Sequence, residues 1–274
     1  MTSSSIQQSY VICTTPRSGS NFLCEVLQAT GVAGHPDEYF WNPPAGHEDW
    51  TLAEWEAYVD QIRQAGTTPD GVFGLKIMWG YFGEVVTRLA SLRDRATASP
   101  PEILAATFPN LRYVHLTRRD KVRQGISWYR AMKTERWRSV DAGTEGAPTP
   151  VFDFEAIHYL ANVAANDDRA WQGFFAQHGI EPLVVVYEEL ERSPEQVSRQ
   201  ILDFLQLSTP ERLPVPESLE RTISQPPRGC APHPFCPSPP QPSSPPVWRH
   251  QRQADALTDA WVQQYHALKG TAPT

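Results

Sequence analysis

The chain has 274 residues, of which 40% are hydrophobic and 20% charged, and its formal net charge is −7 with a pI near 5.6. This length and composition fit one large α/β domain, and the acidic balance argues against non-specific binding to nucleic acid while allowing a local basic pocket. The sequence has no signal-peptide pattern, no apolar stretch of membrane-spanning length and only four cysteines, so we expect a protein of the reducing cytoplasm.

Strand and helix patterns alternate along the chain. Short β-prone runs predict strands at Tyr10–Cys13, Val72–Trp79, Leu111–Thr117 and Leu183–Tyr187. Helical spacing of apolar residues predicts helices at Asn21–Thr30, Leu52–Gln64, Glu84–Ala96, Lys121–Lys133, Phe152–His178, Pro194–Leu205 and Trp248–Leu268. Strands separated by helices predict a P-loop-like three-layer α/β fold, with a central parallel sheet flanked by helices and ligands at the carboxyl ends of the strands.

Proline and serine dominate residues 225–247, which predicts an insert or linker without regular structure. We therefore expect an α/β domain at residues 1–224, this linker, and a C-terminal helix within residues 248–274 that packs on the same domain. Within the linker, Cys230, His233 and Cys236 lack a fourth ligand at a typical spacing, so we expect no metal site there.

The segment Thr15–Asn21, TPRSGSN, joins the first predicted strand to the first predicted helix. Backbone N–H groups and the positive end of the helix dipole meet at such a point and favour an anion. Gly19 allows close approach of the backbone to a ligand, and the guanidinium of Arg17 suits phosphate or sulfate. The alternative is an ordinary helix start, capped by Ser18 or Ser20, with Arg17 in solvent.

A nucleoside-triphosphate P-loop would need a glycine five residues before Gly19 and a lysine directly after it, and this chain has neither. Kinase chemistry is therefore disfavoured. Lys76 interrupts the apolar run Val72–Trp79, so its ammonium must reach the strand end, pair with an anion or extend to the surface.

Several blocks of the chain match one known family. They read PRSGS at residues 16–20, ATGVAG at 29–34, PDEYF at 36–40, GLKIMW at 74–79, SWYRA at 127–131 and RQAD at 252–255. With these blocks the sequence resembles the sulfotransferase superfamily, most closely the bacterial trehalose 2-sulfotransferase type, over most of its length.

The resemblance implies a sulfotransferase that uses 3′-phosphoadenosine 5′-phosphosulfate (PAPS) as donor and releases 3′-phosphoadenosine 5′-phosphate (PAP). No metal is required in principle, because fixed donors can stabilise the charge. It assigns the 5′-phosphosulfate to the loop, which comprises Pro16, Arg17, Ser18, Gly19, Ser20 and Asn21. It assigns the 3′-phosphate to Arg118 and Ser127, with Arg119 as an alternative because the Arg-to-Ser spacing varies by one residue in the superfamily.

The resemblance also points to Glu38 as the general base for the acceptor hydroxyl. On chemistry alone Asp37 and His35 are eligible too. Our hypothesis for Lys76 is that it bridges the transferring sulfonyl group.

The expected acceptor is a small molecule with a hydroxyl group, a trehalose-like sugar or another hydroxylated metabolite. Trp41, Trp79 and Trp137 are candidates for stacking on sugar or adenine, with a place in the core as the alternative. We expect no nucleic acid and no membrane span, and a homodimer is consistent with the resemblance. The rival functions are a nucleotide-dependent kinase and a non-catalytic PAPS- or PAP-binding protein.

Overall fold

The computed structural model describes residues 5–41, 43–92, 97–137, 149–211 and 256–271. The predicted linker and its Cys230, His233 and Cys236 lie outside these residues. In the part of the chain that the structure describes, no helix is both long and apolar enough to cross a membrane.

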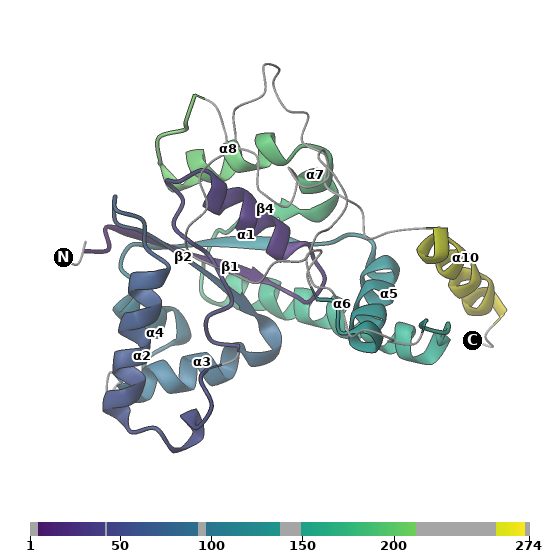
Figure 1. Ribbon diagram of the computed structural model, residues 1–274, viewed down its shortest axis with the longest axis horizontal. Helices are drawn as coiled ribbons and strands as arrows, with labels where there is room; N and C mark the ends of the chain where they lie inside the picture. Colours follow the sequence, from purple (N-terminus) through teal and green to yellow (C-terminus); the bar gives the residue numbers. More distant parts are fainter. Residues whose placement is uncertain (1–4, 42, 93–96, 138–148, 212–255, 272–274) are drawn as a thin grey trace, which may run out of the picture.

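A parallel sheet forms the centre of the fold (Figure 1). Its strands are β1 (Gln8–Thr14), β2 (Val72–Met78), β3 (Leu111–Thr117) and β4 (Leu183–Val186). They lie in the order β2-β1-β3-β4, and every pairing is parallel. The carboxyl ends of all these strands therefore meet at one edge, where the loop that follows β1 lies.

Helices cover both faces of the sheet and continue around it. They are α1 (Ser20–Ala29), α2 (Leu52–Ala65), α3 (Trp79–Leu92), α4 (Pro100–Thr107), α5 (Lys121–Thr134), α6 (Phe154–Gln177), α7 (Tyr187–Arg192), α8 (Pro194–Leu205) and α10 (Ala256–Thr271). A short 3-10 helix, η1, spans His47–Asp49. In Figure 1, α1, α7 and α8 lie above the sheet, and α2, α3, α4 and α6 lie below it.

Alternation along the strands divides the core into two layers. Tyr10 and Ile12 of β1 pack with α1 and α8, whereas Val11 and Cys13 pack with the cluster formed by α3, α4 and α6. Successive side chains of a strand point to opposite faces, so a strand apolar at every position must be covered on both sides. The predicted three-layer fold is thereby confirmed.

Helix α5 supports the site from one side of the sheet edge. It packs closely on α6 because Gly125 has no side chain: a Cβ there would lie 2.7 Å from the carbonyl oxygen of Ile157. Helix α10 completes this unit through Trp261 and Tyr265, which share an apolar cluster with Tyr129 of α5.

Three parts of the secondary structure differ from the sequence prediction. The helix expected at Glu84 begins at Trp79, because Trp79 and Phe82 pack on the buried Trp171 and so outweigh the low helix propensity of the glycines near the start. Helix α4 was not predicted, although Ser99 and Glu102 form a capping box ahead of it. The strand expected to reach Tyr187 ends at Val186, and Tyr187 begins α7.

Candidate active site

The loop between β1 and α1 turns sharply at two residues with positive φ. Gly19 has φ 85° and is the N-cap of α1, with no side-chain cap, and Arg17 has φ 61°. Ser18 is fully buried, and its hydroxyl hydrogen-bonds the hydroxyl of Thr14 at 2.6 Å instead of capping the helix. The alternative of an ordinary capped helix start is therefore wrong, and the positive end of the α1 dipole faces the loop.

Helix α5 holds this loop from behind through Gln124. The Gln124 amide is buried and donates to the Thr15 hydroxyl at 2.7 Å and to the Pro16 carbonyl at 2.6 Å. Lys121 donates to the Gln124 oxygen and also pairs with the buried Asp168 of α6. A buried polar network thus fixes the backbone of the loop.

The guanidinium of Arg17 does not extend into solvent. Its Nε donates to the hydroxyl of Ser127 on α5 at 3.0 Å, and its Nη1 donates to the carbonyl of Trp137. Arg17 and Ser127, which the sequence assigned to opposite ends of one donor molecule, are therefore in direct contact. Ser20, by contrast, is the buried first residue of α1.

Arg118 follows β3 and lies over the same loop. Its Nη1 donates to the Arg17 carbonyl at 3.2 Å, and its guanidinium carbon lies 4.4 Å from the centre of the Tyr187 ring. The Nε of Arg118 is buried and has no hydrogen-bond partner among the described residues. Burial lowers the pKa of Arg118 from its ordinary value, since a buried guanidinium has lost water. An unpaired buried N–H on a cation is a position where an anionic ligand would be stabilised.

The neighbouring Arg119 has a different environment. Its side chain is exposed and pairs with Glu189, and its backbone N–H donates to Glu188 at 3.2 Å. Because Arg119 already has an acidic partner, the geometry favours Arg118 over Arg119 as the anion-binding arginine.

Lys76 connects the loop to Glu38. Its side chain is 1% exposed, and its ammonium lies 2.9 Å from Glu38 Oε2 and donates to Asn21 Oδ1 at 2.6 Å. The alternative of a surface lysine is wrong. Asn21, which is predicted to bind the donor, accepts this hydrogen bond from Lys76 at the start of α1.

Glu38 has a further partner that the sequence did not reveal. The hydroxyl of Tyr81 on α3 donates to Glu38 Oε1 at 3.1 Å, and the Glu38 side chain is 20% exposed. The rival bases are placed differently: Asp37 accepts the backbone N–H of Glu38, and His35 is exposed. The side chain of Glu38 is in contact with the buried ammonium of Lys76.

The three candidate tryptophans lie in different environments. Trp79 packs with its ring centre 5.0 Å from that of the buried Trp171, so it belongs to the core. Trp41 is 66% exposed, and its ring centre lies 5.4 Å from that of Tyr81, beside Glu38. Trp137 is 44% exposed and contacts Arg17 through its carbonyl.

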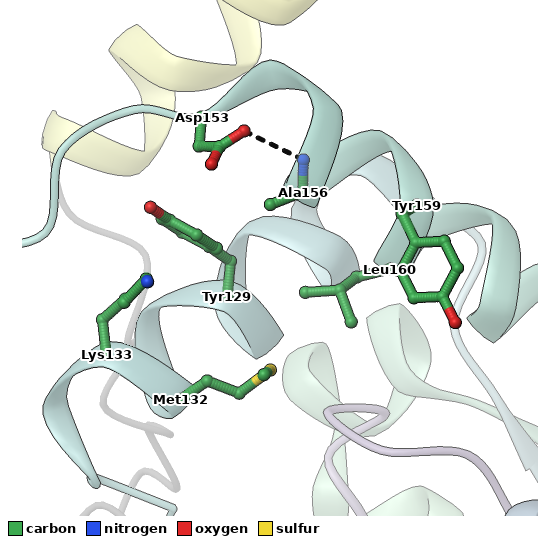
Figure 2. A pocket seen from close by; sticks show the side chains of 7 residues that line it. All are labelled: Tyr129, Met132, Lys133, Asp153, Ala156, Tyr159 and Leu160. Carbon is green, nitrogen blue, oxygen red and sulfur yellow. Dashed lines mark hydrogen bonds between the residues drawn. The ribbon is translucent and has the colours of Figure 1, made fainter.

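A pocket of about 260 Å³ lies away from these residues (Figure 2). Its walls come from α5 and the start of α6, and Figure 2 shows Met132 and Leu160 pointing into it. Tyr129, Lys133, Asp153, Ala156 and Tyr159 complete the lining. None of the candidate site residues lines this pocket, so it is separate from the site.

A parallel sheet with an anion-binding loop after its first strand, a strand-end arginine and a nearby carboxylate is typical of enzymes that act on phosphate or sulfate esters. The family model for Stf0 sulphotransferase matches residues 9–226. The chain therefore belongs to the Stf0 sulphotransferase family and is a sulfotransferase, and the kinase alternative is wrong.

Two curated relatives extend over nearly the whole chain. It is 28% identical to the trehalose 2-sulfotransferase of Mycobacterium tuberculosis (strain ATCC 35801 / TMC 107 / Erdman), over 94% of both proteins. It is 29% identical to the trehalose 2-sulfotransferase of Mycolicibacterium smegmatis (strain ATCC 700084 / mc(2)155), over 93% of both. Among solved structures, the sulfotransferase domain from the curacin biosynthetic pathway aligns over 77% of each chain, with 18% identity and a TM-score of 0.46.

Three residues of the site were missed in the sequence: Gln124, Tyr187 and Tyr81. Gln124 lies within a predicted helix, Tyr81 lies between the strand predicted to end at Trp79 and the helix predicted to begin at Glu84, and Tyr187 was predicted to end a strand. Their partners are distant in sequence, and only the fold brings them together.

Proposed function

We propose that this sulfotransferase transfers a sulfuryl group from PAPS to a hydroxyl group of a carbohydrate, with Glu38 as the general base. The observation that carries the proposal is the contact of Lys76 with both Glu38 and Asn21. One buried ammonium thereby holds the proposed base next to the loop proposed to hold the phosphosulfate.

The residues of the site fit PAPS, which carries a phosphosulfate at its 5′ position and a phosphate at its 3′ position. Arg17 and the start of α1 would hold the 5′-phosphosulfate, together with Pro16, Ser18, Gly19 and Ser20 of the same loop. Arg118, with its unpaired buried Nε, and Ser127 would hold the 3′-phosphate. In this arrangement the contact between Arg17 and Ser127 joins the two halves of the donor site.

The proposed reaction requires hydrogen-bond donors in fixed positions and a general base. The acceptor oxygen forms a bond to sulfur while the bond from sulfur to the 5′-phosphate oxygen breaks, and its electron pair leaves on PAP. Glu38 takes the proton of the acceptor hydroxyl, and Arg17 stabilises the charge that develops on the leaving phosphate. Lys76 lies where it can meet the sulfonyl group from the side of Glu38. We propose no metal in this step.

The acceptor is proposed to be trehalose-like, because both curated relatives are named trehalose 2-sulfotransferase. Trp41 supports a sugar acceptor, since its exposed ring lies beside Tyr81 and Glu38 and aromatic faces pack well on the apolar faces of sugars.

A reducing cytoplasm and a homodimer are part of the same proposal. The two cysteines that the structure describes, Cys13 and Cys24, are buried thiols outside any disulfide of the described residues, which supports a reducing compartment. Light scattering coupled to size exclusion tests the dimer.

Transfer of ³⁵S from labelled PAPS to trehalose, other disaccharides and non-sugar alcohols tests the function. We expect a labelled sugar sulfate, with the sugars preferred over the simple alcohols. Glu38→Gln should abolish transfer while PAP still binds, as measured by calorimetry. PAP binding by the wild type without transfer to any acceptor would favour the non-catalytic alternative, and full activity of Glu38→Gln would refute the assignment of the base.

A further inference from the structure

The carboxylate of Glu38 is held at both oxygens by donors from two different elements. Lys76, from the buried strand β2, lies 2.9 Å from Oε2, and Tyr81, from the first turn of α3, donates to Oε1 at 3.1 Å. The backbone of the same loop is fixed as well, because the N–H of Lys76 donates to the Asp37 carbonyl at 3.0 Å. A carboxylate held by one ion pair can still rotate about that contact, whereas a second donor fixes its plane.

Tyr81 is itself rigidly placed. Its side chain is 6% exposed within the core cluster that contains Phe82 and Val85. Trp41 packs against its ring, and the backbone N–H of Trp41 closes a turn onto the Glu38 carbonyl at 3.1 Å. The position of the tyrosine hydroxyl is therefore set by the core and by the turn that carries Glu38.

The Tyr81 hydroxyl remains protonated at any working pH. Burial raises the pKa of Tyr81 far above its ordinary value, and the adjacent charge of Glu38 raises it further. The hydroxyl can thus serve as a permanent donor to the ionised carboxylate. The titratable groups that face this pair are Lys76 of β2, Asp37 of the same loop and Cys24 of α1.

We propose that Tyr81 is a positioning residue for the reaction: its hydroxyl orients the Glu38 carboxylate toward the acceptor hydroxyl. This inference rests on the proposed role of Glu38. It assigns a function to a tyrosine that otherwise has the burial and packing of an ordinary core residue.

The test is the split between kcat and KM for Tyr81→Phe in the ³⁵S transfer assay. Loss of the hydrogen bond that orients the carboxylate should lower kcat about tenfold, which corresponds to the net contribution of one hydrogen bond to a charged group. The KM for PAPS should stay unchanged, because the variant alters the acceptor side.

Tyr113→Phe is the matched control. Tyr113 is 8% exposed in the same core cluster, and its ring contacts Phe174 and Phe175 of α6. Its variant should keep the wild-type kcat and the wild-type KM for PAPS. Thermal melting of both variants establishes that they are folded at the assay temperature.

The outcomes separate the two proposals. A kcat of Tyr81→Phe equal to that of the wild type would overturn the role of Tyr81, and so would a loss of activity that lies in the KM for PAPS. An equal loss of kcat in Tyr113→Phe would overturn it too, because the effect would then be general to the core. Absence of transfer by the wild type would instead refute the proposed function.

Discussion

Replacement of Gly19 by alanine tests the packing of the loop more sharply than any other single change. Gly19 has φ 85°, and a Cβ there would lie 2.3 Å from Cδ2 of Tyr187, whose ring supports Arg118. The left-handed conformation costs a residue with a Cβ about 1–2 kcal/mol. The overlap with Tyr187 adds about 1–3 kcal/mol, since either the ring or the loop must move.

Gly31→Ala supplies the matched control for this change. Gly31 also has positive φ, 72°, but a Cβ there would meet no atom within 4 Å. Gly31→Ala should therefore lose only the conformational part, about 1–2 kcal/mol of unfolding free energy. The difference between the two variants measures the contact between Gly19 and Tyr187.

Urea unfolding followed by circular dichroism gives the two free energies, and calorimetry with PAP gives the affinities. We expect Gly19→Ala to be the less stable variant and to bind PAP at least about tenfold more weakly, because displacement of Tyr187 also displaces Arg118. Equal stabilities of the two alanine variants, together with equal PAP affinities, would refute this account of the loop.

Three further predictions concern other parts of the site. Lys76→Met should lower the unfolding free energy by about 2–4 kcal/mol and kcat by at least about a hundredfold, because Glu38 loses its buried partner. Urea unfolding measures the loss of stability, and ³⁵S transfer measures the loss of kcat. Trp41→Ala should raise the KM for the sugar about three- to tenfold and leave stability unchanged, since its side chain is 66% exposed; an unchanged sugar KM would refute the stacking role. For Asp168, burial alone would raise the pKa, but its polar neighbours His115, Lys121 and Thr117 outweigh burial and lower it. The ionised Asp168 carboxylate therefore stabilises the folded protein above the ordinary carboxylate pKa, and this stabilisation is lost as the pH falls through the lowered pKa of the folded state. The urea midpoint of Asp168→Asn should accordingly depend less on pH in the acid range than that of the wild type.

Much of the fold could be predicted because its signals are local. The strand at Val72 is apolar at every position except Lys76, and a strand buried on both faces requires that pattern. The loop at Thr15–Asn21 was found for the same reason, since its glycine and arginine lie within a few residues of a strand end and a helix start.

The geometry of the site could not be predicted from the sequence because it depends on contacts between distant segments. Glu38 was proposed from a motif, yet its hydrogen bond with Tyr81 joins residues that are 43 positions apart. Gln124 reaches the loop across 109 positions, and no local pattern distinguishes it from a helix residue facing another helix. Asn21 was assigned to the donor as part of a motif, whereas its side-chain oxygen contacts Lys76.

The contacts of Lys76 explain why a buried charge is retained in an apolar strand. A lysine at 1% exposure loses nearly all its hydration, which is costly unless strong partners replace the water. Here the replacements are a carboxylate from the loop after α1 and an amide oxygen from the first turn of α1 itself. The loop that carries Glu38 and the loop proposed to carry the donor are therefore attached to the same ammonium. A displacement of either loop would leave that ammonium without one of its partners, so the ion pair fixes the distance between the proposed base and the proposed donor site.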